Sequence, residues 1–229
     1  GKLGTFWHTQ GSGKSYSMIY FSKKVRRRIT GNWSFLIITD RNDLDDQIFK
    51  NFCDTKTISL GKTEKTDQNE YRAKGQGSRK QLELALTQNK SFYFSTIFNF
   101  GIAKGKKYTH KSDRENWIVI VDEAHRSQYK GLGENLKIAL PNAQYMAFTG
   151  TPILKKGVTE KWFGGYVSEY NFAQSIEDGA TVPLFYRKSV PSVVLENDDL
   201  SDEAQEILDS YDINEEQRQK LDKEYSTLF

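Results

Sequence analysis

Residues 3–15 have the sequence LGTFWHTQGSGKS. The first half is a short apolar run typical of a strand, and the second half is a glycine-bearing loop that leads into a helix predicted to start at Lys14 or Ser15. Such a loop binds phosphate, because its backbone N–H groups point at the anion and the helix dipole favours negative charge. The stretch therefore predicts a phosphate-binding loop between a strand and a helix.

Each residue type in this loop has a chemical reason to be there. Gly11 and Gly13 let the backbone approach the ligand, Lys14 can reach the β- and γ-phosphates, and Ser15 can ligate Mg²⁺. The predicted nucleotide-binding residues are Gln10, Gly11, Ser12, Gly13, Lys14 and Ser15.

The loop departs from the general pattern G-x-x-x-x-G-K-[ST] at its first position, where the chain has His8. A chance GSGKS sequence is the alternative interpretation, but the strand before it and the amphipathic helix after it favour a phosphate loop. A small GTPase is disfavoured, because residues 89–92 read NKSF and lack the aspartate of a base-reading N-K-x-D motif.

Charge is distributed unevenly along the 229 residues. Residues 1–160 contain 27 Lys and Arg against 15 Asp and Glu, whereas residues 161–229 contain 6 against 15. A basic body suits a nucleic-acid partner, although a solvated basic surface has the same composition. The single cysteine, Cys53, cannot form an internal disulfide, and no apolar run approaches the ~20 residues of a membrane span, so we expect a cytoplasmic protein without membrane contact.

Residues 117–125 read WIVIVDEAH and form the second chemical landmark. An apolar strand here delivers two adjacent carboxylates at its carboxyl end, where open α/β sheets bind their ligands. Asp122 is suited to hold Mg²⁺, and Glu123 to orient or deprotonate the water that attacks a γ-phosphate.

Alternation of apolar strands with amphipathic helices predicts an α/β fold in which helices cover both faces of a parallel sheet. Asp43 is a plausible helix cap, and residues 56–78 are expected to be mostly loop. The expected strands are 3–8, 34–39, 57–60, 91–97, 117–122, 144–148 and, as an edge strand, 182–186. The expected helices are 14–30, 43–52, 79–86, 132–140, 171–178 and two acidic amphipathic helices within 201–228.

Four segments resemble motifs I, Ia, II and III of the first motor domain in the restriction (R) subunit of type I restriction-modification enzymes. They are HTQGSGKS (8–15), TDRNDLDDQ (39–47), DEAHRSQ (122–128) and FTGTPI (148–153). Residues 163–164 and 168–179 also resemble that subunit.

The resemblance implies a RecA-like, ATP-binding motor domain over residues 1–155. Residues 156–229 would be a connecting segment and an acidic helical appendage leading toward a second motor domain. It also implies ATP and Mg²⁺ as cofactors, double-stranded DNA as the translocated substrate, and methyltransferase and specificity subunits as partners.

The same resemblance implies a role for individual residues. Phe98 and Asn99 stand where the family tends to have Gln-Lys, which weakens the DNA assignment of this segment. The implied catalytic residues are Lys14, Asp122, Glu123 and His125; the metal ligands Ser15 and Asp122; the coupling residues Thr149, Gly150 and Thr151; and the DNA contacts Arg41, Ser95 and Thr96.

Two alternatives stay open. One is a different superfamily 2 motor, such as a type III restriction subunit, a helicase or a remodeller; the other is a non-hydrolysing scaffold domain. The chain shows neither the family's nuclease domain nor a second motor domain with its arginine finger. We therefore expect these residues alone to bind Mg-ATP weakly and to hydrolyse it slowly or not at all.

Overall fold

The computed structural model describes residues 1–58, 70–75, 77–102, 107–124, 131–151, 158–183 and 185. The chain divides into two compact units, Gly1–Pro183 and Leu184–Phe229, and the first contains all the elements below. His125 and the acidic helices expected within 201–228 lie outside the described residues. In the described part of the chain, no helix is long and apolar enough to cross a membrane.

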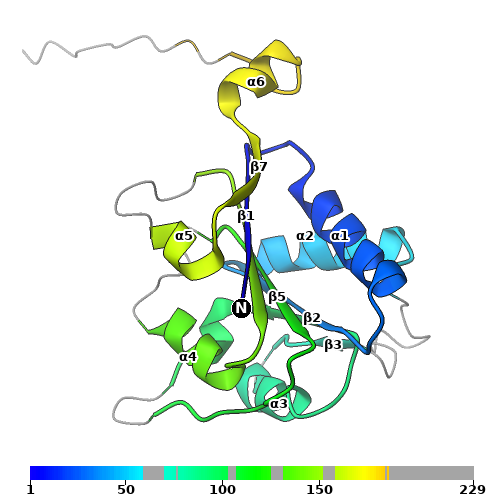
Figure 1. Ribbon diagram of the computed structural model, residues 1–229, viewed down its shortest axis with the longest axis vertical. Helices are drawn as coiled ribbons and strands as arrows, with labels where there is room; N and C mark the ends of the chain where they lie inside the picture. The colour runs from blue at the N-terminus through cyan, green and yellow to red at the C-terminus, as the bar shows by residue number, and fades with distance from the viewer. Residues whose placement is uncertain are drawn as a thin grey trace, which may run out of the picture. The chain divides into compact units, whose positions relative to one another are not determined.

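A seven-stranded sheet forms the centre of the first unit, in the order β3-β4-β2-β5-β6-β1-β7 (Figure 1). Every neighbouring pair is parallel, which confirms the predicted parallel α/β sheet. The strands are β1 (Lys2–His8), β2 (Ser34–Thr39), β3 (Glu70–Arg72), β4 (Phe92–Thr96), β5 (Trp117–Asp122), β6 (Gln144–Thr149) and β7 (Tyr166–Tyr170).

Helices cover both faces of this sheet, as predicted. Successive side chains of a strand point to opposite faces, so Ile118 and Ile120 of β5 join one apolar core, while Val119 and Val121 join the other. This double burial explains why the central strands read as continuous apolar runs. The first core packs against α1 (Lys14–Arg28) and α2 (Asn42–Asp54); the second packs against α3 (Ser78–Ala85), α4 (Leu132–Ala139) and α5 (Val158–Phe163).

Two short elements complete the unit. The 3₁₀ turn η1 (Ile97–Phe100) follows β4, and α6 (Phe172–Glu177) follows β7. The helix predicted at 171–178 is confirmed: the Asn171 side chain accepts from the Gln174 N–H at 3.0 Å, and the Gln174 side chain accepts from the Asn171 N–H at 2.9 Å. This capping box fixes where α6 begins.

Both edge strands differ from the sequence prediction. Thr57 and Ile58 form a bend after α2 instead of a strand, and the edge strand on that side is β3. Val182 and Pro183 have no strand conformation, and the opposite edge is β7, which pairs with β1. The first unit extends to Pro183.

The start of α2 also differs from the prediction. Asn42 is its first residue and Arg41 its N-cap, and no side chain makes a capping hydrogen bond there. Asp43 instead lies in the first turn, where its charge favours the helix through the dipole.

The central position of β1 determines where the phosphate loop lies. Trp7 is in register with Thr149 of β6, and His8 with Tyr170 of β7. Because all strands run the same way, the segments that follow β1, β5 and β6 emerge at one edge of the sheet (Figure 1). This side of the sheet, formed by the carboxyl ends of the strands, is where open parallel sheets bind ligands. It is called the carboxyl edge below.

Candidate functional site

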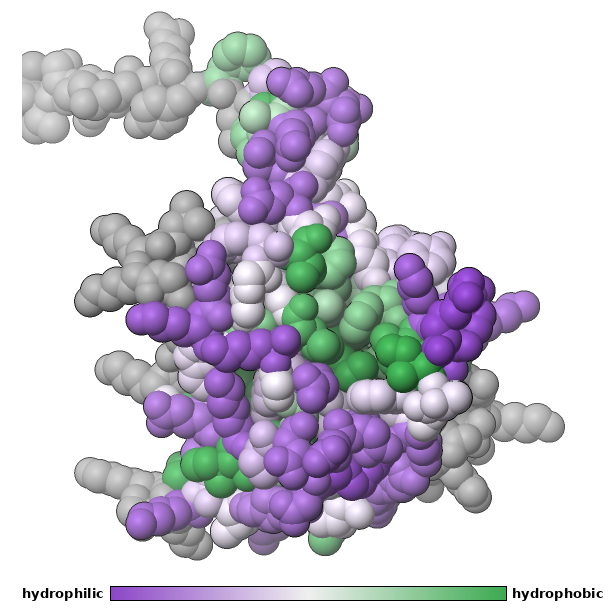
Figure 2. Space-filling model, in the orientation of Figure 1, coloured by the Kyte–Doolittle hydropathy of each residue, from purple (hydrophilic) through white to green (hydrophobic). Residues whose placement is uncertain are grey.

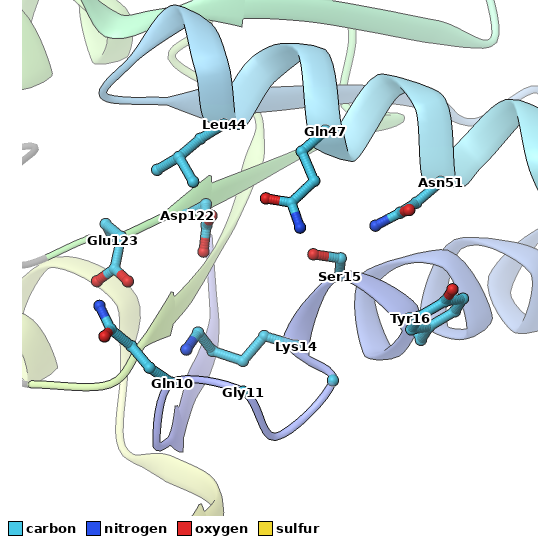
Figure 3. A pocket seen from close by; sticks show the side chains of 11 residues that line it. Gln10, Gly11, Lys14, Ser15, Tyr16, Leu44, Gln47, Asn51, Asp122 and Glu123 are labelled. Atoms are coloured by element: carbon cyan, nitrogen blue, oxygen red, sulfur yellow. The ribbon is translucent and has the colours of Figure 1, made fainter.

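A cavity of about 340 Å³ opens at this carboxyl edge (Figure 3). It brings Lys14 and Ser15, at the start of α1, together with Asp122 and Glu123, at the end of β5. The two landmarks found far apart in the sequence therefore share one cavity. Its lining residues are Gln10, Gly11, Gly13, Lys14, Ser15, Tyr16, Leu44, Gln47, Asn51, Asp122 and Glu123.

The loop between β1 and α1 depends on glycine for its backbone conformation. Gly11 and Gly13 have φ values of 79° and 81°, in the left-handed region that other residues rarely adopt. A side chain at either position would meet nothing within 4 Å, so conformation, not space, requires glycine here. The Gly13 carbonyl accepts from the Tyr16 N–H at 2.9 Å, which starts α1 and leaves its first N–H groups at the cavity.

The Lys14 ammonium is held over the end of β1. Its Nζ donates to the carbonyl oxygens of His8, at 3.1 Å, and Thr9, at 3.2 Å. The Ser12 hydroxyl donates to the same Thr9 carbonyl at 2.6 Å, and Ser12 is the one predicted loop residue absent from the cavity lining. A positive charge therefore lies beside a loop of backbone amides, which is the arrangement that a polyphosphate requires.

The predicted coupling residues lie against this loop, at the end of β6. The Trp7 indole N–H donates to the Gly150 carbonyl at 3.2 Å, and a Cβ at Gly150 would lie 3.7 Å from Lys14 Nζ. Thr149 is fully buried, and its hydroxyl accepts from the Thr151 N–H at 3.1 Å. This turn contacts the phosphate loop without lining the cavity.

Asp122 is a buried carboxyl without a complete set of partners. Its side chain is 8% exposed, and its Oδ1 atom has no hydrogen-bond partner in the described part of the chain. Burial, followed by repulsion from Glu123, raises the pKa of Asp122 to about 7, against the opposing attraction of Lys14. A buried carboxylate oxygen facing a hydroxyl-bearing loop is a ligand that a hard divalent cation prefers, and the cation would lower this pKa.

Glu123 has an unusual backbone. Its φ of 48° lies in the left-handed region, which is costly for a residue with a long side chain. This conformation follows directly after β5, and the Glu123 side chain lines the cavity with its carboxylate beside the Gln10 carboxamide (Figure 3). Strain of this kind is commonly found where a side chain must point at a ligand.

The donor set fits Mg²⁺ bound together with a polyphosphate. Within the described ranges, no three His, Cys, Asp or Glu residues gather as a metal cluster. Mg²⁺ commonly takes one or two protein ligands and fills its other positions with phosphate oxygens and water. Ser15 and Asp122, both in the cavity lining, can supply those protein ligands.

Helix α2 supplies cavity residues that the sequence analysis did not identify. Leu44, Gln47 and Asn51 are spaced three and four residues apart, so they lie on one face of the helix and form a wall of the cavity. Tyr16 was also missed. The helical spacing was a usable signal, but which face of α2 meets the cavity depends on how the helix packs on the sheet.

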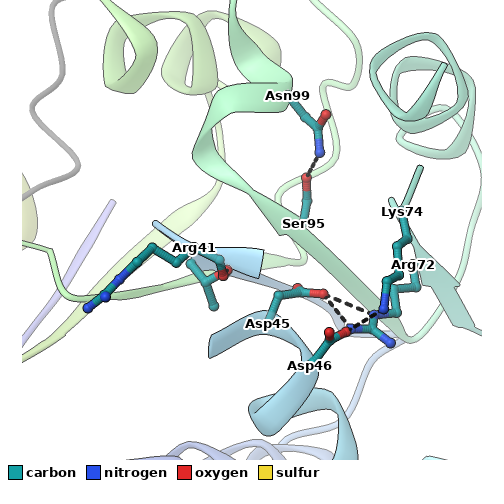
Figure 4. A network of polar contacts seen from close by, with 8 residues as sticks. Arg41, Asp45, Asp46, Arg72, Lys74, Ser95 and Asn99 are labelled. Atoms are coloured by element: carbon teal, nitrogen blue, oxygen red, sulfur yellow. Dashed lines mark hydrogen bonds and ion pairs between the residues drawn. The ribbon is translucent and has the colours of Figure 1, made fainter. Parts of the chain in front are cut away.

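The predicted DNA-contacting residues lie apart from this cavity. Arg41 is exposed over 54% of its side chain and lies 3.8 Å from Asp40 (Figure 4). Thr96 is 8% exposed. Ser95 is fully buried; its hydroxyl donates to the Thr96 carbonyl at 3.1 Å and accepts from Asn99 Nδ2 at 3.0 Å. The Ser95 side chain therefore cannot reach a surface-bound duplex, and it holds the η1 turn instead.

Comparisons with known proteins agree with this geometry. The family model described as SWI2/SNF2 ATPase matches residues 1–219. A type I restriction enzyme HindI endonuclease subunit from Haemophilus influenzae is 38% identical over 202 residues, covering 81% of this chain and 18% of the relative. A putative type I restriction enzyme MjaIXP endonuclease subunit from Methanocaldococcus jannaschii is 33% identical over 230 residues, covering 99% of this chain and 21% of the relative.

A solved structure supports the fold independently. It is a nuclease-deletion mutant of the type ISP restriction-modification enzyme LlaGI in complex with a DNA substrate mimic, with a TM-score of 0.55 at 14% identity. The match covers 79% of this chain and 19% of that one. The chain thus spans about a fifth of the curated relatives it matches. It belongs to the SWI2/SNF2 ATPase family, and its curated relatives are endonuclease subunits of type I restriction enzymes.

Proposed function

We propose that this chain is the ATP-binding half of a motor that translocates double-stranded DNA in a type I restriction enzyme. One observation carries the proposal: Lys14, Ser15, Asp122 and Glu123 line a single cavity at the carboxyl edge of the sheet. Phosphoryl transfer needs little covalent chemistry from a protein, so positioning and charge neutralisation are most of what the site must supply.

Each cavity residue has a proposed part in hydrolysis. The loop amides of residues 10–15 and the Lys14 ammonium bind the phosphates, while Ser15 and Asp122 hold the cation. Glu123 orients or deprotonates the attacking water, and His125, which follows in the same motif, assists it. Bound Mg²⁺ would neutralise charge on the β- and γ-phosphate oxygens.

The turn after β6 is proposed to couple the nucleotide to DNA. The Gly150 carbonyl accepts from the Trp7 indole N–H, and a hydrogen bond between Thr149 and Thr151 holds the turn. A Cβ at Gly150 would lie 3.7 Å from Lys14 Nζ. A displacement of Lys14 on nucleotide binding would therefore also displace this turn. Arg41, exposed at the same edge of the sheet, is proposed to bind the DNA backbone together with Thr96.

The proposed partners follow from the curated relatives, which are subunits of type I restriction enzymes. We propose that the full protein acts in the cytoplasm with methyltransferase and specificity subunits, and that the specificity subunit selects the DNA sequence. Co-purification of the full-length protein with these two subunits tests the assembly, and their absence from the purified complex would contradict it.

Nucleotide binding by the 229-residue chain tests the proposed function. A fluorescent ATP analogue should bind in the presence of Mg²⁺, be displaced by unlabelled ATP, and lose its affinity in Lys14→Ala. Glu123→Gln should retain binding, because a carboxamide keeps the size of the side chain and removes only its basicity. Tyr20→Ala, a change of an exposed residue on α1, serves as the control. Absence of binding by the unaltered chain would refute the motor and favour the scaffold alternative.

A further inference from the structure

Helix α2 presents two different faces. Ile48 and Phe52 are buried in the core between the helix and the sheet. Leu44, Gln47 and Asn51 lie on an adjacent face and line the cavity. Packing on the sheet therefore fixes α2 in a position that turns this stripe, which includes the carboxamides of Gln47 and Asn51, toward the predicted phosphate site.

The carboxamide groups of Gln47 and Asn51 are available to bind a ligand. Neither Gln47 nor Asn51 makes a side-chain hydrogen bond with any residue that the structure describes. Figure 3 shows the Gln47 carboxamide directed between Ser15 and Asp122, whereas the Asn51 carboxamide, from the next turn of α2, points toward Ser15. Gln47 thus faces both predicted cation ligands, whereas Asn51 lies beyond Ser15 as seen from Asp122.

One carboxyl oxygen of Asp122, in the same part of the cavity, lacks a hydrogen-bond partner among the described residues. Asp122 Oδ1, on the opposite side of the gap, is buried without a hydrogen-bond partner. A carboxamide has both an acceptor oxygen and a donor N–H₂ group, whereas an ionised carboxylate only accepts. Gln47 can therefore hydrogen-bond a water molecule that also contacts Asp122. The gap between Gln47, Ser15 and Asp122 is lined by groups that complement a hydrated cation.

We propose that Gln47 is a positioning residue for the cation, acting through a water molecule of the cation's hydration shell. This inference rests on the proposed function, because it assumes that Mg²⁺ binds with the nucleotide. Mg²⁺ keeps several of its waters when it binds to proteins, and groups that orient such outer ligands set its affinity. Gln47 supplies that orientation from α2, on the side of the cavity opposite Lys14.

The experiment measures nucleotide affinity with and without the metal. The 229-residue chain and its Gln47→Leu variant are titrated with a fluorescent ATP analogue, once with excess Mg²⁺ and once with EDTA. The unaltered chain should bind more tightly with Mg²⁺. Gln47→Leu should reduce the ratio of the two affinities by about tenfold or more while leaving the affinity in EDTA unchanged.

Two further variants separate the role of the carboxamide from a loss of packing. Gln47→Glu keeps an acceptor oxygen at the same place and should retain the magnesium dependence. Asn42→Leu makes the same chemical change at an exposed carboxamide of α2 outside the cavity lining, and its affinity ratio should equal that of the unaltered chain. Thermal unfolding of each variant verifies that α2 stays folded, and Mn²⁺ titrations followed by electron paramagnetic resonance report the metal site directly.

The outcomes distinguish this inference from the proposed function. No nucleotide binding by the unaltered chain would overturn both. Magnesium-dependent binding with an unchanged ratio in Gln47→Leu would overturn the inference alone. Equal weakening of this variant in Mg²⁺ and in EDTA would assign Gln47 to the nucleotide itself and would likewise overturn its role toward the cation.

Discussion

Asp122 combines two demands that conflict at the scale of a single residue. The proposed role as a cation ligand requires an ionised carboxylate, yet burial and the neighbouring Glu123 raise the pKa of Asp122 to about 7. Burying a carboxylate without full hydrogen bonding costs stability, and evolution accepts such costs at functional sites. The loop and the acid pair could both be predicted from sequence, because each is a local pattern; the burial that perturbs Asp122 could not.

In metal-free buffer, Asp122→Asn should stabilise the chain increasingly with pH. The folded carboxyl retains its proton up to about pH 7, whereas the unfolded one releases it near the ordinary pKa of 3.8, so the stability of the unaltered chain declines between these values. The variant lacks this decline, and its advantage should approach a few kcal/mol, at most about 4, above pH 7. Urea unfolding in EDTA at several pH values measures it.

Asp43→Asn is the matched control, because Asp43 is exposed in the first turn of α2. It should leave the pH dependence of unfolding unchanged. Equal stability of Asp122→Asn and the unaltered chain at pH 8 would contradict the proposed cost of burying this carboxyl.

At the scale of elements, the two edge strands show the limit of sequence reasoning. The central strands are apolar runs and were predicted, but β3 has three residues and β7 alternates between partly buried and exposed side chains. Both edges form through distant partners: β3 pairs with β4, and β7 pairs with β1. A single-sequence pattern carries little information about such tertiary pairing.

Strand β3 is held by an ion-pair network with α2 (Figure 4). Arg72 Nε and Nη2 donate to Asp45 Oδ2 at 2.9 and 2.8 Å, Arg72 also bonds Asp46, and its guanidinium lies 4.3 Å from the centre of the Phe49 ring. Burial raises the pKa of Asp45, and Arg72 opposes that shift. Because β3 has only three residues, few backbone hydrogen bonds hold it in the sheet, and these ion pairs with α2 add to its stability.

Arg72→Leu should therefore destabilise the chain by about 3 kcal/mol, because it leaves the buried Asp45 without its cation. Lys74→Leu removes only an exposed pair with Asp46 and should cost less than about 1 kcal/mol. Denaturant unfolding of both variants measures the difference. Equal costs would show that the pairing of β3 does not depend on Arg72.

Strand β7 depends on a close approach to β1. Gly4 has a φ of 123°, and a Cβ there would overlap the Val167 side chain and lie 3.0 Å from the Gly165 carbonyl oxygen. Gly4→Ala should destabilise the chain by roughly 2 kcal/mol through strain and displacement of β7. Gly165→Ala is the control: nothing lies within 4 Å of its added Cβ, so its unfolding midpoint should stay close to that of the unaltered chain.

At the scale of the whole molecule, the cavity contains few cationic side chains. Among its described lining residues, Lys14 is the one cationic side chain, and no arginine is present. Arginines supplied from a second domain or protein accelerate phosphoryl transfer by about 10³–10⁵ elsewhere.

The 229-residue chain should consequently bind ATP but hydrolyse it slowly, with no stimulation by double-stranded DNA. Full-length protein carrying Glu123→Gln should lose DNA translocation, while the unaltered full-length protein retains it. Phosphate release and a triplex-displacement assay measure the two activities. Brisk DNA-stimulated turnover by the 229-residue chain would contradict the expectation.

The parallel sheet also separates the two ends of β1. The Gly1 nitrogen lies 2.6 Å from the Ala143 carbonyl oxygen, ahead of β6, whereas the other end of β1 leads into the phosphate loop. A purification tag, a dye or a surface linker joined to Gly1 would thus emerge on the side remote from the cavity mouth. Immobilisation of the 229-residue chain through Gly1 leaves nucleotide access open, which suits this position to single-molecule and biosensor measurements.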